Sequence, residues 1–253
     1  MNGAGNDFVM IDDRSLRCAT ASESMLKIAE QVPCEGILLL QPSASADLKM
    51  RFFNPDGNEA EMCGNGARCF ARLAYDLKAA PSKMRMETAA GIVGAEMLGE
   101  RVRLMMTDPQ DLRLHIQLAD LPELHFLNTG VPHVVVPVES AEQAAVETVG
   151  RAIREQAEFA PAGTNVNFVE VRADGSLRLR TYERGVEAET GACGTGAVAS
   201  ALIAAKLGLV DLPVKLQCNG GELEVNAALD GDAFRNVTLT GPAVYEFEGT
   251  LEC

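Results

Sequence analysis

Two short strings decide how this chain is organised: MCGNGA at residues 62–67 and ACGTGA at residues 192–197. Both contain Cys-Gly-x-Gly-Ala, and their cysteines, Cys63 and Cys193, lie 193 − 63 = 130 residues apart in a chain of 253. Apolar residues at helical spacing follow each string, which predicts helices over 67–77 and 197–207. The second helix is apolar almost all round, so it should be buried. The sequence therefore predicts an internal repeat with one such helix in each half.

Short strand-like segments dominate the rest of the chain and are separated by Gly, Asp, Asn and Pro. Apolar spacing predicts two further helices, over 22–31 and 141–157. Strands are expected at 8–11, 37–40, 48–53, 102–106, 134–138, 167–171, 177–182, 214–217 and 237–240. This pattern predicts an α/β fold of the α+β type, with two similar domains, each a mostly antiparallel sheet wrapped round a central helix. We expect the domains to cover residues 1–115 and 116–253, with the last C-terminal strand available to the first domain.

Composition and charge exclude several classes of protein. With 47% hydrophobic and 23% charged residues, the chain has an ordinary globular composition. A net charge of −14 without a basic patch argues against nucleic-acid binding, and no apolar run reaches the roughly 18 residues of a membrane span. Seven cysteines with no CxxC pair and no signal peptide indicate a reducing, cytoplasmic location. There is no P-loop, no zinc motif and no motif for a pyridoxal-phosphate lysine, so we expect no metal.

The placement of Cys63 and Cys193 suggests their chemistry. Each precedes an expected helix, where free backbone N–H groups and the positive end of the helix dipole favour a thiolate. The adjacent glycines allow a ligand close to the backbone, whose N–H groups can bind a carboxylate. Two such thiols facing each other across a domain cleft would remove a proton from one face of a carbon and deliver one to the other. The sequence therefore predicts an active site between the domains that inverts a stereocentre.

Five blocks resemble the diaminopimelate epimerase family and follow that family's order along nearly the whole chain. They are GAGNDFVMID (3–12), FFNPDGNEAEMCGNGAR (52–68), GVPH (130–133), NVNFVEV (165–171) and ERGVEAETGACGTGA (183–197). The resemblance implies epimerisation of L,L-diaminopimelate to meso-diaminopimelate in lysine and cell-wall precursor biosynthesis. It also implies a two-cysteine acid/base mechanism without any cofactor, diaminopimelate as the small-molecule partner, and a homodimer.

The resemblance also assigns roles to matched residues. Cys63 and Cys193 would be the catalytic thiols, Arg184 would bind the distal carboxylate with its planar donor fork, and Glu183 would bind an ammonium group. His133 would be an accessory residue, with a buried structural histidine as the alternative. The expected substrate-binding set is Asn6, Asn54, Gly64, Asn65, Asn165, Glu183, Arg184, Gly194 and Thr195.

The chain departs from the family pattern at several points. Val131 stands where the family often has Asn, Glu35 lies in a segment that differs from most members, and Gly191 replaces a usual Leu beside the second cysteine. Most members also carry a short strand before the residue that matches Met1, so either the start codon is misassigned or that strand is missing here.

Two other readings stay open at this point. A proline or hydroxyproline racemase would use the same pair of thiols, but Asn65 and the Glu183-Arg184-Gly185 approach differ from the His and the Asp-Arg-Ser-Pro typical of those enzymes. A binding or redox-sensing module could instead join Cys63 and Cys193 in a disulfide if their geometry allows it. Such a switch would need none of the Asn, Glu and Arg residues in the matched blocks.

Overall fold

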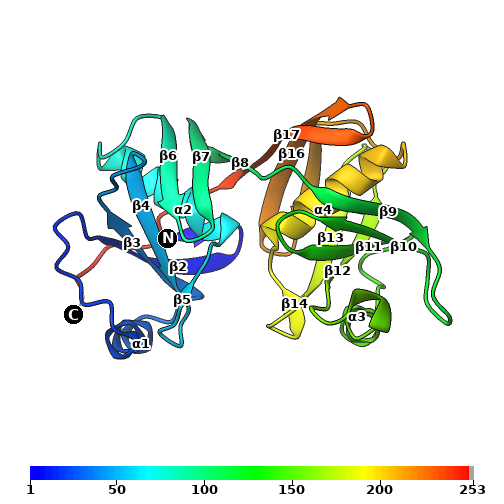
Figure 1. Cartoon of the computed structure of the whole chain (residues 1–253), viewed down its shortest axis with the longest axis horizontal. Helices are drawn as coiled ribbons and strands as arrows, with labels where there is room; N and C mark the ends of the chain where they lie inside the picture. Colours follow the sequence, from blue (N-terminus) through cyan, green and yellow to red (C-terminus); the bar gives the residue numbers. More distant parts are fainter. Residues whose placement is uncertain (251–253) are drawn as a thin grey trace. The chain divides into compact units, whose positions relative to one another are not determined.

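A computed structural model describes residues 1–250, so Cys253, for which the sequence suggests only a structural role, lies outside the described residues (Figure 1). The chain forms two compact units. The first unit comprises Met1–Met105 together with the residues from Thr240 onward, and the second comprises Met106–Leu239. Residues 106–115, which the sequence places in the first half, thus belong to the second unit, where the Met106 N–H donates to the Val237 carbonyl at 2.9 Å.

The first unit is a mixed sheet with α2 as its central helix. The pairs β2–β3 and β4–β6 are parallel, whereas β3–β4, β4–β5, β6–β7 and β7–β8 are antiparallel. Helix α2 packs against β1, β2, β3, β4, β7 and β8, and α1 packs against β3 (Figure 1). The elements are β1 Asn2–Gly3, β2 Asn6–Asp12, α1 Ser22–Gln31, β3 Gly36–Gln41, β4 Leu48–Phe53, β5 Glu59–Ala60, α2 Gly64–Asp76, β6 Lys83–Thr88, β7 Gly91–Leu98 and β8 Arg101–Met105.

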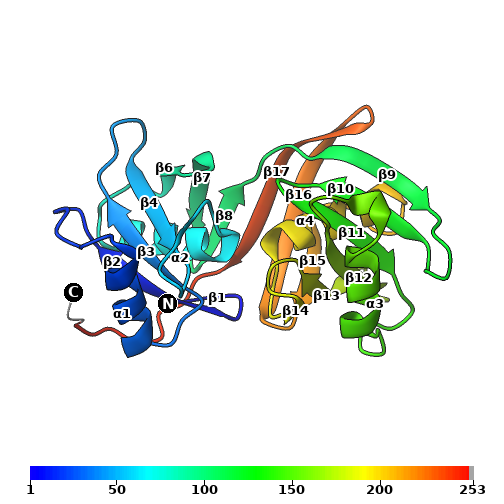
Figure 2. The ribbon, with the colours of Figure 1, turned by 60° about the horizontal axis from the view of Figure 1, so that its bottom comes forward.

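The second unit repeats this plan around α4. The pairs β11–β12 and β13–β15 are parallel, whereas β9–β10, β10–β11, β12–β13, β13–β14 and β15–β16 are antiparallel. Helix α4 packs against β10, β11, β12, β13, β15 and β16 (Figure 2). The elements are β9 Gln110–Ile116, β10 Leu124–Asn128, β11 Pro132–Pro137, α3 Val146–Arg154, a 3-10 turn Ala157–Phe159, β12 Asn165–Val171, β13 Leu177–Glu183, β14 Ala188–Thr190, α4 Gly194–Lys206, β15 Val214–Cys218, β16 Gly221–Asp230 and β17 Ala233–Pro242.

The order of strands and helices around α2 matches that around α4, with β9 and the 3-10 turn as additions in the second unit, which confirms the predicted repeat. In the first unit Phe8 of β2 lies opposite Gly36 of β3, and in the second His133 of β11 lies opposite Asn165 of β12. Counting two residues along β3 and β12 from these pairs makes Leu38 the counterpart of Asn167. These matched positions provide an internal comparison between the surroundings of the two cysteines.

The helices confirm the expected pattern with two corrections. Helix α1 has the predicted bounds, but α2 and α4 begin three residues earlier than predicted, at Gly64 and Gly194, directly after the cysteines. The predicted helix 141–157 is wrong at both ends, because α3 covers only Val146–Arg154. Arg180 Nη1 donates to the carbonyls of Ala141, Glu142 and Ala144, which holds 141–145 as a turn.

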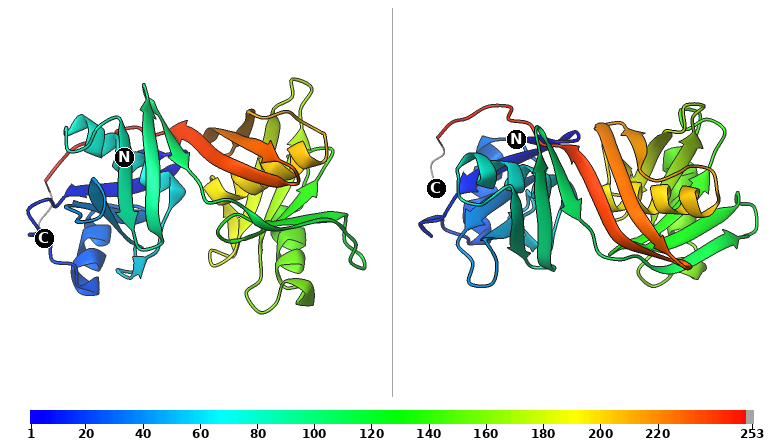
Figure 3. Two further views of the ribbon diagram at one scale, coloured as in Figure 1. Left: turned by 45° about the horizontal axis from the view of Figure 1, so that its top comes forward. Right: turned by 90° about the horizontal axis from the view of Figure 1, so that it is seen from above.

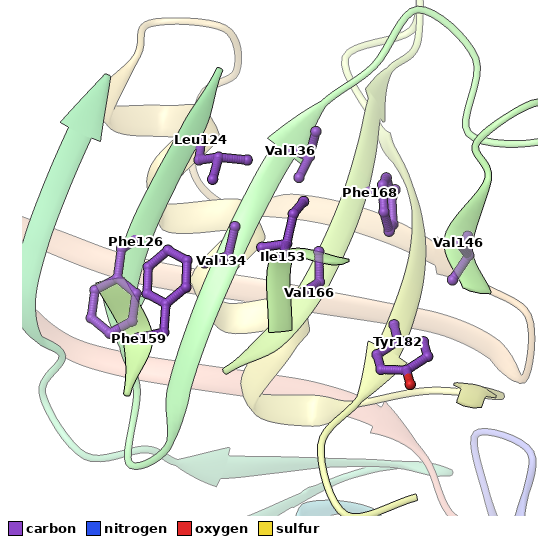
Figure 4. Packing of buried hydrophobic residues seen from close by; sticks show 10 residues of the cluster. All are labelled: Leu124, Phe126, Val134, Val136, Val146, Ile153, Phe159, Val166, Phe168 and Tyr182. Carbon is purple, nitrogen blue, oxygen red and sulfur yellow. The ribbon is translucent and has the colours of Figure 1, made fainter. Parts of the chain in front are cut away.

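Buried apolar side chains hold α3 and the 3-10 turn against the second unit's sheet. Figure 4 shows this cluster, in which the stacked rings of Phe126 and Phe159 have centroids 5.9 Å apart and Tyr182 is fully buried. On the other side, α4 buries every residue from Gly196 to Ala204, as its apolar sequence predicts. At about 25 cal/mol per Å² of buried apolar area, these contacts are the main stabilisation of the unit and fix the position of Cys193 at the start of α4.

The chain from Thr240 onward, which includes the last residues of β17, belongs to the first unit. The backbones of Asn2 and Val244 exchange two hydrogen bonds, at 2.7 and 2.8 Å, beside the N-terminus (red segment in Figure 3). Within residues 1–250, none of the helices is both long enough and apolar enough to cross a membrane.

Candidate active site

Cys63 occupies the N-cap of α2. Its backbone is extended (φ −131°, ψ 121°), and its carbonyl accepts the first helical hydrogen bond, from the Ala67 N–H at 2.8 Å. The residue is partly exposed and directly precedes Gly64 and Asn65, whose backbone N–H groups belong to the first turn of the helix. This position suits both a thiolate and a bound carboxylate.

Three polar side chains are linked next to Cys63. The guanidinium of Arg68 is fully buried and donates to Asn65 Oδ1 at 2.8 Å and to the Pro242 carbonyl at 3.1 Å. The Asn65 Nδ2 then donates to Asn6 Oδ1. Because Arg68 has only donors, it fixes the amide orientation of Asn65 and, through it, that of Asn6. The structure thus brings the predicted residues Asn6 and Asn65 together.

Cys193 occupies the same place in the second unit. It is the N-cap of α4 (φ −109°, ψ 111°), its carbonyl accepts the Ala197 N–H at 2.9 Å, and the residue is 8% exposed. Its sulfur lies 3.5 Å from the hydroxyl of Thr195, which is a normal distance for a hydrogen bond involving sulfur. The predicted residues Gly194 and Thr195 therefore form the first turn beside the thiol.

A buried polar chain continues from Thr195 into the unit. Thr195 Oγ1 lies 2.9 Å from His133 Nε2, and His133 Nδ1 lies 3.1 Å from Asn167 Nδ2. His133 is fully buried, and burial, followed by the positive charge of Arg184, lowers its pKa to about 3. The imidazole is therefore neutral over the physiological pH range.

The predicted residues Asn165, Glu183 and Arg184 meet at the end of β13. Asn165 Nδ2 donates to the Pro132 carbonyl at 3.1 Å, and Asn165 Oδ1 accepts the Arg184 backbone N–H at 2.9 Å. The Arg184 guanidinium donates to the Ala162 carbonyl at 3.0 Å. Burial raises the pKa of Glu183, against which the 2.9 Å hydrogen bond from the Thr190 hydroxyl acts. Arg184 is thus a cation held in place by a hydrogen bond, and a cationic partner would stabilise the ionised form of Glu183.

The remaining predicted or divergent residues have hydrogen bonds of their own. Asn54 is in the β4–β5 turn, where its backbone bonds to Asn58 and Gly57. Glu35 is exposed and accepts the Asp7 backbone N–H. The Val131 carbonyl accepts the Thr129 N–H at 3.2 Å, and the Gly191 carbonyl accepts the Gly220 N–H at 2.7 Å. Asn54, Val131 and Gly191 thus make backbone hydrogen bonds, whereas Glu35 binds the Asp7 backbone with its side chain.

Further titratable side chains, cysteines and histidines among them, lie outside these groups. Among residues 1–250, no three His, Cys, Asp or Glu side chains cluster as metal ligands. Within the same residues, no disulfide joins any of Cys18, Cys34, Cys63, Cys69, Cys193 and Cys218. His115 pairs with Glu123 at 2.8 Å at the surface.

Sequence reasoning missed Arg68, Asn167 and Thr181. Arg68 carried no signal, because helical spacing places it outside the apolar stripe of Ala67, Phe70 and Ala71. Asn167 is a polar residue within an otherwise buried strand, which calls for a partner. Thr181 carried none, because threonine is ordinary in strands.

One family model and several curated proteins match nearly the whole chain. The family model described as "Diaminopimelate epimerase" matches residues 1–112 and 125–246. The diaminopimelate epimerase of Aquifex aeolicus is 42% identical over 99% of this chain and 96% of its own length. That of Chlorobaculum tepidum is 39% identical, with 99% of each chain covered.

Solved structures share the fold at lower identity. A Bacillus anthracis phenazine biosynthesis protein of the PhzF family superposes with a TM-score of 0.75 at 19% identity, covering 97% of this chain and 93% of its own. A probable proline racemase from Agrobacterium radiobacter gives a TM-score of 0.62 at 20% identity, covering 87% and 78%. At these identities the likeness concerns the fold alone.

Proposed function

The chain belongs to the diaminopimelate epimerase family, and from this premise we propose that it interconverts L,L-diaminopimelate and meso-diaminopimelate. It is an isomerase, and the reaction serves lysine and cell-wall precursor biosynthesis. The observation that carries the proposal is the repeated N-cap cysteine: Cys63 and Cys193 each begin the central helix of one unit. A chemically alike pair suits a reversible, nearly symmetric proton exchange at one carbon.

The two thiols would act as the acid/base pair. One thiolate takes the α-proton, the C–H electron pair moves into the adjacent carboxylate, and the other thiol returns a proton to the opposite face of the carbon. The charge that develops on the carboxylate would be stabilised by the first-turn N–H groups of Gly64–Asn65 and Gly194–Thr195. Every proton and electron pair is balanced between the substrate and two side chains, and the carbon is inverted.

The remaining polar residues would recognise the substrate. Arg184 offers a donor fork to the distal carboxylate, and Glu183 offers a carboxylate to an ammonium group. Burial raises the pKa of Glu183, so a bound ammonium would favour its ionised form. Asn6, whose Oδ1 is already used by Asn65, would donate with its Nδ2, and Asn54 and Asn165 complete the proposed set. His133 acts as an accessory residue behind Thr195.

We also propose that the enzyme works as a cytoplasmic homodimer. The acidic net charge of −14 keeps such a protein soluble and disfavours nucleic acid as a partner.

The test is proton NMR in deuterated water with the reduced protein. With L,L-diaminopimelate, the α-proton signal should disappear as the meso form appears, and proline offered in parallel should show no exchange. Exchange with proline but not with diaminopimelate would refute the proposed substrate.

A further inference from the structure

The hydrogen bonds that lead from Asn167 through His133 and Thr195 to Cys193 have a defined donor and acceptor at each step. The Asn167 side chain has two partners that settle its orientation: Nδ2 donates to the Val134 carbonyl at 2.9 Å, and Oδ1 accepts from the Thr181 hydroxyl at 3.0 Å. A carbonyl oxygen has only acceptor sites, so the atom that faces it must be the NH₂ group of Asn167. The same NH₂ group faces His133 Nδ1 at 3.1 Å.

This orientation selects one tautomer of His133. Since Asn167 Nδ2 is a donor, His133 Nδ1 must be the acceptor, and the neutral ring therefore carries its hydrogen on Nε2. His133 is 0% exposed, so water does not compete for either nitrogen. His133 Nε2 then donates to Thr195 Oγ1, which lies 2.9 Å away.

The hydroxyl of Thr195 is directed in turn. Because its oxygen accepts from His133, its hydrogen is available to the neighbouring Cys193 sulfur at 3.5 Å. We propose that Asn167 is a positioning residue: it holds His133 in the Nε2–H tautomer, which aims the Thr195 hydroxyl hydrogen at the sulfur of Cys193. This inference rests on the proposed function only for its catalytic consequence, the stabilisation of the Cys193 thiolate between turnovers.

At the matching positions, the first unit has no counterpart of the hydrogen-bonded pair Asn167 and His133. The positions that match His133 and Asn167 are occupied by Phe8 and Leu38. Gly66 of α2 packs against these apolar side chains, whereas the matching Gly196 of α4 packs against Asn167 and His133. The two thiols therefore sit on similar helix ends but on different supports, and Asn167 acts on Cys193 alone.

The first test reads the tautomer directly. NMR of the protein labelled with ¹⁵N-histidine should show His133 with a protonated Nε2 and an unprotonated Nδ1, its signals being assigned by their loss in His133→Phe. A protonated Nδ1 in the unliganded protein would overturn the proposal. This measurement needs no substrate, and the tautomer is determined in the wild-type protein.

The second test measures the reactivity of the Cys193 sulfur. In Asn167→Leu, which copies the first unit, the rate of alkylation of Cys193 by iodoacetamide at pH 7 should fall about tenfold, the size of one lost hydrogen bond to a charged group, while that of Cys63 stays unchanged. Mass spectrometry of the two cysteine peptides gives both rates in one sample. Thr195→Val should have the same effect and Thr195→Ser should keep the wild-type rate, because it restores the hydroxyl.

The outcomes separate this inference from the proposed function. Slowing of both cysteines together, or of neither, contradicts a role of Asn167 that is specific to Cys193. Both measurements are made without diaminopimelate. A protein that fails to turn over diaminopimelate but shows the Nε2–H tautomer and selective slowing of Cys193 would refute the function and keep the inference.

Discussion

Two cysteines of α2 show how position decides the chemistry of a residue. Cys63 caps the helix and is partly exposed, whereas Cys69 is fully buried six residues later. Burial raises the pKa of Cys69 to about 12, so this thiol stays protonated and inert. The contrast follows from the helix register, which places Cys63 at the open end and Cys69 against Gly3.

Replacing either capping cysteine should abolish epimerisation. Cys63→Ala and Cys193→Ala should each lower kcat by about 10²–10⁴-fold, the usual contribution of one acid/base group. Steady-state assays in both directions measure this, with Cys18→Ala as the control because that thiol lies outside the proposed site. A single variant that keeps wild-type kcat would contradict the two-thiol mechanism.

Glu183 makes stability depend on pH in a specific direction. Burial raises its pKa in the folded state, so its neutral form is favoured there, and the stability it contributes below the ordinary Glu value of about 4.3 is lost as pH rises through the raised value. Glu183→Gln should therefore have a higher Tm than the wild type at pH 7, and the difference should shrink toward pH 4.

Calorimetry at both pH values checks this prediction for Glu183→Gln, and activity should fall because the ammonium partner is lost. The matched control is Glu187→Gln at the exposed end of the same turn, where the Gly185 backbone N–H and Arg154 lower the pKa. Equal Tm differences at the two pH values for Glu183→Gln would show that burial does not destabilise its charge.

How much of the site could be foreseen differs from residue to residue. The two cysteines and their neighbours lie in a repeated string that also resembles a known family, so their positions at helix N-termini could be predicted. Asn167 and Thr181 were not, because their role depends on which strands pair: Asn167 lies opposite Thr181 only through the register of β12 and β13.

At the scale of elements, the helices that carry the cysteines differ in how tightly they pack. A Cβ on Gly196 would lie 2.4 Å from Asn167 Oδ1, whereas a Cβ on Gly66 would lie 3.1 Å from the flexible end of Leu38. Close packing of α4 against β12 thus requires glycine at 196, and α2 tolerates more at the matched place.

Gly196→Ala should therefore destabilise the protein by about 1–3 kcal/mol through overpacking. Gly66→Ala should be close to neutral, since the gain of about 0.5–1 kcal/mol for Ala over Gly within a helix offsets a mild contact. Urea unfolding of the two variants measures both effects. Equal losses of stability would show that the two helices pack alike.

The strands that the sequence failed to predict are mainly those with few of the β-branched residues Val, Ile and Thr. Strand β6, KMRMET, buries Met84 and Met86 and exposes Arg85 between them. Strands β7 and β16 contain Gly, Ala and Glu. The strands β9, β10 and β14 were missed as well, since their pairing partners rather than their own composition specify them.

At the scale of the whole molecule, the first unit is discontinuous and the second is not. The buried guanidinium of Arg68 donates to Pro242, and Asn2 pairs with Val244, so the N-terminal residues need the C-terminal segment. The second unit is one continuous stretch, Met106–Leu239. The sequence indicated two halves, but the return of the C-terminal segment depends on contacts far apart in the chain.

Fragments should behave accordingly. Residues 106–239 alone should unfold cooperatively and give a dispersed amide spectrum, whereas residues 1–105 alone should not, because Arg68 loses a buried acceptor at a cost of about 1–3 kcal/mol. Joining residues 240–253 to 1–105 through a short glycine linker should restore folding. A well-folded 1–105 fragment would contradict this account of the first unit.

The central claim, that two thiols serve the two faces of one carbon, is tested most directly by following deuterium in the first turnovers. When L,L-diaminopimelate reacts in deuterated water, the earliest meso product should carry deuterium at the inverted carbon, while the unreacted L,L substrate stays unlabelled, because the proton leaves to one sulfur and the deuteron arrives from the other. Early product that keeps the original proton, or early labelling of the remaining substrate at the same rate, would mean that one base serves both faces.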